Sequence, residues 1–164
     1  MKLIPPTLFF TLFAVIAVSA EERVPFGWVQ MCADDPRSLL CAESLFVDMK
    51  KSHIYSKDID RHGRRDLWKS QLFRYLNRNV IAGDCEDFAI TMVELALILD
   101  LAEPEDVSLT ICRVPGQRVT HAVAVVSGRW FDYRHDEITT SQSNRCKPIQ
   151  SLNLATLKWT GEQI

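Results

Sequence analysis

The chain has 164 residues, of which 47% are hydrophobic and 24% are charged. This composition excludes a disordered protein and predicts one domain with a substantial core. The formal net charge of −2 excludes a strongly basic nucleic-acid-binding protein, so we expect no nucleic-acid partner.

The N-terminal segment predicts an export signal. Lys2 precedes an apolar run from Leu8 to Val18, and small residues precede Glu21. The run is shorter than the roughly 20 residues of a membrane-spanning helix, and the small residues are typical of a cleavage site. We therefore expect a signal peptide at 1–20, a single domain at 21–164 and a periplasmic location. An uncleaved membrane anchor is the alternative.

Apolar residues at helical spacing predict three helices in the first two thirds of the chain. They cover residues 36–52, 67–77 and 85–101, and the polar residues 53–65 predict a loop between the first two. The third helix is apolar nearly all round, which is typical of a helix in the middle of a domain.

The remaining residues predict strands. Residues 107–114 alternate between apolar and polar, and residues 120–133 have the pattern of a hairpin with its turn at Ser127-Gly128. A polar loop at 139–147 and a last short strand within 152–159 follow. The expected fold class is α+β, with the third helix packed on a small antiparallel sheet.

A cysteine stands in the first turn of this central helix. The segment is Gly83-Asp84-Cys85-Glu86-Asp87-Phe88-Ala89. The unpaired N–H groups and the positive end of the helix dipole stabilise an anion, so we expect a lowered pKa and a nucleophilic thiolate at Cys85. A buried structural cysteine is the alternative.

The predicted hairpin carries a histidine and an aspartate. With the turn at Ser127-Gly128, Val123 faces Asp132, and His121 lies diagonal to Asp132 on the same face. A three-residue loop would instead turn Asp132 to the opposite face. Cysteine, histidine and aspartate in this arrangement are typical of nucleophilic catalysis, in which histidine takes the thiol proton and aspartate fixes the histidine tautomer.

Five cysteines in an exported chain suggest disulfide bonds with one thiol left over. We expect Cys85 to be the free one. Cys32 with Cys41, and Cys112 with Cys146, is one of the three pairings that four cysteines allow. The sequence does not choose among them.

The block at 83–89, together with His121-Ala122-Val123 and Phe131-Asp132, resembles the bacterial transglutaminase-like cysteine proteinases, periplasmic relatives within the papain and transglutaminase superfamily. The resemblance covers about residues 28–135. Four residues before the cysteine also match, namely Asp60, Gly63, Asp66 and Trp68. The chain departs from the family pattern at Lys69-Ser70-Gln71 and at Tyr133.

This resemblance implies a papain/transglutaminase-like core with Cys85 as nucleophile, His121 as base and Asp132 as its orienter. It also implies a calcium ion that Asp84 and Glu86 help to bind. Asp84 as a helix N-cap beside acidic residues that favour the helix dipole is the alternative.

The expected activity is that of a cysteine endopeptidase that works through a thioester. The resemblance implies a protein substrate in the cell envelope and a membrane-bound regulatory receptor, and we expect a monomer. An amidase or transglutaminase with the same triad is one alternative. A catalytically silent interaction module is the other.

A second acidic motif, Asp58-Ile59-Asp60-Arg61-His62-Gly63, imitates the opening of an EF-hand loop. Its twelfth position is Lys69, where a bidentate glutamate is required. We therefore expect no standard calcium loop here.

Overall fold

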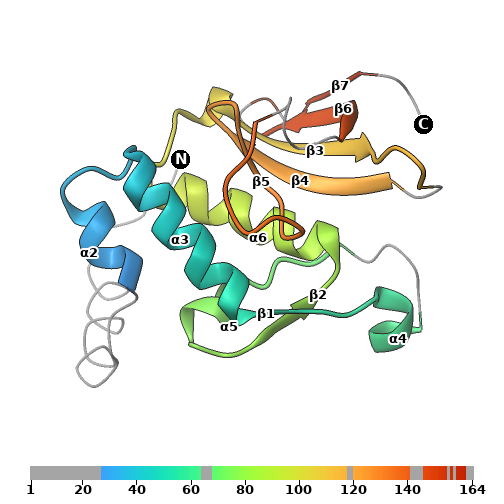
Figure 1. The fold of residues 1–164 in the computed structure, drawn as a ribbon, viewed down its shortest axis with the longest axis horizontal. Coiled ribbons are helices and arrows are strands. Elements are labelled where there is room, and N and C mark those ends of the chain that lie inside the picture. The colour runs from blue at the N-terminus through green and yellow to red at the C-terminus, as the bar shows by residue number, and fades with distance from the viewer. Residues whose placement is uncertain are drawn as a thin grey trace, which may run out of the picture.

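The computed structural model describes residues 27–63, 68–117, 120–140, 146–154, 156 and 158–161. The predicted signal peptide and Asp66 lie outside them. The described residues have the expected α+β architecture, in which helices lie along a five-stranded antiparallel sheet (Figure 1). A separate two-stranded parallel sheet lies among the helices.

The helices agree in part with the sequence pattern. They are α2 (Gly27–Ala33), α3 (Leu39–Ser52), α4 (Asp58–His62), α5 (Leu72–Leu76), α6 (Cys85–Ile98) and the 3-10 helix η2 (Pro104–Asp106). Helix α3 begins later than predicted because the Ser38 hydroxyl caps it, accepting a hydrogen bond from the Cys41 N–H. The predicted helix 67–77 is reduced to α5.

The strands correct two predictions. They are β1 (His53–Tyr55), β2 (Ile81–Gly83), β3 (Val107–Arg113), β4 (Thr120–Val126), β5 (Arg129–Phe131), β6 (Lys147–Asn153) and β7 (Lys158–Gly161). The predicted loop 53–65 is wrong, since it contains β1 and α4. The single strand expected within 152–159 is also wrong, because β6 and β7 form an antiparallel pair there.

The register of the β4–β5 hairpin is the predicted one. Val126 pairs with Arg129 and Ala124 with Phe131, in a sheet of order β5-β4-β3-β6-β7. Ser127 and Gly128 both have positive φ, at 47° and 75°, which suits a tight two-residue hairpin turn. His121 and Asp132 therefore lie on one face, as expected.

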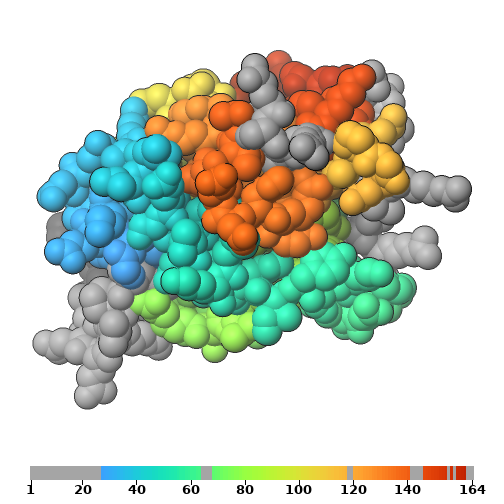
Figure 2. All heavy atoms as spheres, viewed as in Figure 1, coloured from blue at the N-terminus to red at the C-terminus, as the bar shows by residue number. Residues whose placement is uncertain are grey.

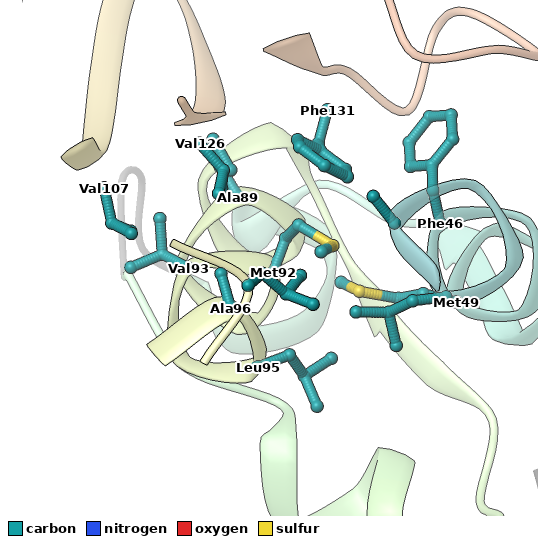
Figure 3. Packing of buried hydrophobic residues seen from close by; sticks show 14 of the residues in the cluster. Phe46, Met49, Ala89, Met92, Val93, Leu95, Ala96, Val107, Val126 and Phe131 are labelled. Carbon is teal, nitrogen blue, oxygen red and sulfur yellow. The ribbon is translucent and has the colours of Figure 1, made fainter. Parts of the chain in front are cut away.

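Helix α6 is the centre of the core. Figure 1 shows it beneath β3 and β4, which it contacts. Its apolar residues face the sheet on one side and α3 on the other (Figure 3). The Phe46 ring of α3 meets Phe88 of α6 at 6.2 Å and Phe131 of β5 at 5.8 Å, both edge to face. This packing of α3, α6 and β5 holds the N-terminal end of α6 in a fixed position against the sheet.

Two disulfides join elements of this fold. Cys32–Cys41 links α2 to α3, and Cys112–Cys146 links β3 to the residue before β6. This pairing is one of the three that the sequence allows. Cys85 is the free cysteine, as expected.

Among the residues that the structure describes, no helix combines the length and apolar composition needed to cross a bilayer.

Candidate functional site

Cys85 is the first residue of α6, and its partly buried thiol lies at strand β4. The backbone N–H of Ala122 favours the thiolate form of the sulfur and so acts to lower the pKa of the thiol. Ala122 follows His121 in β4, and α6 packs on β4, so the helix that begins with Cys85 lies on the strand that carries the predicted base.

His121 and Asp132 form a buried pair. His121 is 6% exposed and Asp132 1% exposed, and the imidazole Nε2 lies 2.9 Å from Asp132 Oδ1. Because Asp132 is a carboxylate here, Nε2–H is the donor, and Nδ1 is the ring nitrogen left for the thiol. The structure thus brings together the two hairpin residues that the register predicted.

The charge of Asp132 is stabilised from two sides. Burial alone would raise the pKa of its carboxyl, but hydrogen bonds from His121 and Arg134 outweigh burial and hold the pKa below its usual range. Arg134 donates from its backbone N–H to Oδ1 at 3.0 Å and from Nη2 to Oδ2 at 2.5 Å. Sequence reasoning had assigned no role to Arg134.

The pKa of the Cys85 thiol corrects a prediction. Burial raises it, and so do the charge and hydrogen bonding of the Glu86 carboxylate, whereas the Ala122 N–H lowers it. The thiol donates to Glu86 Oε2 at 3.0 Å. The helix-terminus argument predicted a lowered pKa. Burial and the acidic neighbour act against the effect expected of the helix terminus, and a thiol whose pKa is raised is protonated at neutral pH.

Two tyrosines form a stacked pair next to His121. The Tyr133 ring lies 5.6 Å from the His121 ring, and Tyr55 stacks on Tyr133 at 5.7 Å with 14° between the planes. The pKa of each phenol is raised by burial first and by the charge of Cys85 second. Tyr55 is 50% exposed, so this aromatic pair forms a partly open wall beside His121.

Three aspartates gather on the other side of the α6 N-terminus. Oxygens of Asp58, Asp84 and Asp87 all lie within 4.8 Å of one another. Asp87 accepts from Arg61 Nη1 at 2.8 Å and from the Lys69 N–H at 2.7 Å. This group differs from the predicted pair of Asp84 and Glu86, because α4 brings in Asp58.

Asp84 has the least balanced charge of this group. Its Oδ1 is buried without a hydrogen-bond partner among the described residues, and Oδ2 accepts a long hydrogen bond of 3.4 Å from the Asp58 N–H. Burial, and then Glu86 and Asp58, raise its pKa to about 7. Its side chain makes no capping hydrogen bond to α6, so the N-cap alternative does not account for its carboxylate.

Asp58 was missed as a member of this group. Its signal in the sequence is the acidic pair of the EF-hand-like motif, which fails as a standard loop. Asp58 joins Asp84 through the fold instead, because β1 pairs with β2 and carries the start of α4 to the residues before Cys85.

No protein-family model and no curated protein matches this chain. Among solved structures, calcium-bound LapG of Legionella pneumophila is similar with a TM-score of 0.49 and 19% identity, over 77% of this chain and 82% of that one. A second LapG structure and an EGTA-treated one have the same TM-score at 18% identity, over 77% of this chain and 82% and 80% of theirs.

Proposed function

We propose that this chain is an exported cysteine endopeptidase of the transglutaminase-like cysteine proteinase family. Cys85 is the nucleophile, His121 the base and Asp132 the residue that orients His121. The observation that carries the proposal is the buried His121–Asp132 hydrogen bond of 2.9 Å, next in the chain to Ala122, whose amide acts to lower the pKa of the Cys85 thiol.

The proposed reaction is acyl transfer through a thioester. Nδ1 of His121 takes the thiol proton, the sulfur attacks a peptide carbonyl, and the imidazolium returns the proton to the leaving amine as the C–N bond breaks. Water, deprotonated by His121, then releases the acid. The backbone N–H of Cys85 at the start of α6 is a donor for the oxyanion.

We propose that Asp84 and Glu86 hold calcium, with Asp58 and Asp87 as neighbouring carboxylates. Carboxylate oxygens are the ligands that calcium prefers, and the unpartnered Asp84 Oδ1 and the raised Asp84 pKa support a cation here. When bound, calcium supplies positive charge beside carboxylates, one of which raises the pKa of Cys85.

Residues 1–20 direct export to the periplasm, and residues 21–164 form the single enzymatic domain. We propose a protein of the cell envelope as substrate, with a membrane-bound receptor as regulator and a monomer as the working state. Gel filtration of residues 21–164 tests the last point, since a dimer would contradict it.

A catalytically silent interaction module is the second candidate. The observation that favours it is the protonated thiol, because Glu86 accepts its hydrogen bond and burial raises its pKa. In this case calcium would stabilise the folded chain and would have no part in catalysis.

One experiment separates these functions. Residues 21–164 are incubated with a peptide library and a primary amine, with and without calcium, and the products are identified by mass spectrometry. Peptide cleavage that Cys85→Ala abolishes supports the endopeptidase. Amine incorporation or side-chain deamidation selects an amidase or transglutaminase, and the absence of any Cys85-dependent turnover selects the silent module.

A further inference from the structure

We propose that Arg134 is a positioning residue for catalysis, which holds Asp132 in the one orientation that fixes His121. This inference rests on the proposed function and adds to it a residue outside the triad. Its basis is the set of hydrogen bonds that Asp132 accepts.

Both oxygens of Asp132 are held by Arg134. Oδ1 accepts from the Arg134 N–H at 3.0 Å and from Nε at 3.1 Å, in addition to His121 Nε2 at 2.9 Å. Oδ2 accepts from Nε at 3.0 Å and Nη2 at 2.5 Å. A planar guanidinium that holds both oxygens prevents rotation of the carboxylate, which a single donor does not.

Asp132 needs such a holder because of its position in the chain. Strand β5 ends at Phe131, so sheet pairing does not extend to Asp132. Its carboxylate is buried, and a buried charge requires compensation. Arg134, two residues later, supplies both the charge and the geometry.

The turn that carries Arg134 is itself fixed. The His135 N–H donates to the Asp132 carbonyl at 3.0 Å. Lys50 Nζ of α3 donates to the His135 carbonyl at 2.5 Å and pairs with Asp136 at 2.8 Å. Figure 2 shows the orange atoms of this segment against α3. Helix α3 thus holds in place the turn from which Arg134 reaches Asp132.

Arg134 has two effects on His121, and they oppose each other. Its charge weakens the pull of Asp132 on a protonated imidazole, whereas its geometry keeps Oδ1 at Nε2. Removing a partner that orients a functional residue typically costs about 10- to 100-fold in activity, so we expect the geometric effect to dominate. Arg134→Lys keeps the positive charge but loses the planar fork of N–H donors that holds both carboxylate oxygens. Arg134→Gln loses both the charge and the fork.

The test reads His121 directly and needs no substrate. Long-range ¹H–¹⁵N spectra of the histidine side chains, assigned with His121→Gln, report its tautomer, and alkylation by iodoacetamide reports the thiol of Cys85. In the wild type we expect the Nε2–H tautomer. In Arg134→Gln we expect a mixture of tautomers and alkylation slower by about 10- to 100-fold, with Arg134→Lys between the two. Arg37→Gln, which removes a surface arginine paired with Asp100 and Glu103, should match the wild type.

A wild-type His121 spectrum and alkylation rate in Arg134→Gln overturn the proposal. A complete return to wild-type values in Arg134→Lys overturns the role of the fork. If circular dichroism shows that Arg134→Gln is unfolded, Arg134→Lys alone decides, because it keeps the buried charge compensated. A failure of the proposed function would be seen in a different measurement. In that case the wild type would show no Cys85-dependent cleavage of the peptide library.

Discussion

His53 is the residue whose titration should be visible in the stability of the fold. Its Nε2–H donates to the Gly83 carbonyl at 3.1 Å, and its ring contacts Phe88 at 5.1 Å. Burial lowers its pKa from 6.5 to about 4, and the Gly83 carbonyl opposes this only in part. As pH falls from 6.5 to 4, the unfolded chain binds a proton that the folded chain does not. The free energy of unfolding should therefore fall over this range.

His53→Gln measures this contribution, because glutamine keeps a donor for Gly83 and does not titrate. We expect the variant to lose less stability than the wild type between these pH values, by on the order of 2 kcal/mol after allowance for partial exposure. Urea unfolding at a series of pH values gives the slopes. The exposed His62 provides the control His62→Gln. Equal slopes in the wild type and His53→Gln would contradict the account.

Gly83 is required by the side chain of Asp87. A Cβ at position 83 would lie 2.5 Å from Asp87 Cβ and Oδ2, and Asp87 is held in place by Arg61 and Lys69. Gly83→Ala should therefore lower the free energy of unfolding by about 1 to 3 kcal/mol, as overpacking does. At Gly27 nothing lies within 4 Å of an added Cβ, so Gly27→Ala is the control. Equal denaturation midpoints for the two variants would be the contrary result.

At this scale the sequence was sufficient for some residues and not for others. His121 and Asp132 were found because a two-residue turn sets the register between neighbouring strands, which is a local rule. The direction of the Cys85 pKa shift was wrong, since burial and the Glu86 side chain depend on how the fold closes around the thiol. Asp58 was missed for a similar reason, because β1 and β2 are far apart in sequence.

The elements show the same division between local and distant determinants. Helix α6 and strands β3 and β4 were predicted because each has enough residues for its period to show. Strands β1 and β2 have three residues each and pair in parallel across the intervening α4 and α5. A strand of three residues is too short to show an alternation of apolar and polar side chains. The polar composition of residues 53–65 therefore predicted a loop.

The two disulfides should contribute unequally to stability. Cys112 and Cys146 are 34 residues apart, whereas Cys32 and Cys41 are 9 apart. Chain entropy favours the cross-link with the longer loop, at about 3.8 kcal/mol against about 2.6 kcal/mol. Replacing Cys112 and Cys146 by alanine should therefore lower the denaturation midpoint more than replacing Cys32 and Cys41.

Guanidinium unfolding of the two double variants, each compared with wild type under oxidising conditions, measures the difference. Cys85→Ala is the control for loss of a cysteine without loss of a cross-link, because Cys85 is free. A larger loss from the Cys32–Cys41 pair would show that the contact between α2 and α3 matters more than loop length.

For the molecule as a whole, calcium should raise stability by binding the folded chain alone. At a concentration a hundred times its Kd, it would add about 2.7 kcal/mol, or roughly 5 to 10 °C in Tm. EGTA should remove this gain. Asp84→Asn should abolish the response to calcium while it raises the stability of the calcium-free protein at neutral pH, because it removes a carboxylate whose pKa burial raises.

Scanning calorimetry with calcium and with EGTA tests this expectation. Asp100→Asn removes an exposed carboxylate on the opposite end of α6 and should keep the wild-type response. An equal Tm for the wild type in calcium and in EGTA would exclude a stabilising calcium site.

The placement of the candidate triad on two layers has a consequence for how reactivity can change. The imidazole is on strand β4 and its carboxylate on the residue that follows strand β5, so their mutual spacing is set within about a dozen consecutive residues. The sulfur belongs to a helix on which the β4–β5 hairpin rests through Ala89, Met92 and Phe131 (Figure 3). Methyl groups gained or lost in this apolar contact would alter the gap between sulfur and ring while the imidazole–carboxylate bond stayed intact. If the triad is catalytic, evolution could thus tune its rate through side chains that never touch a substrate.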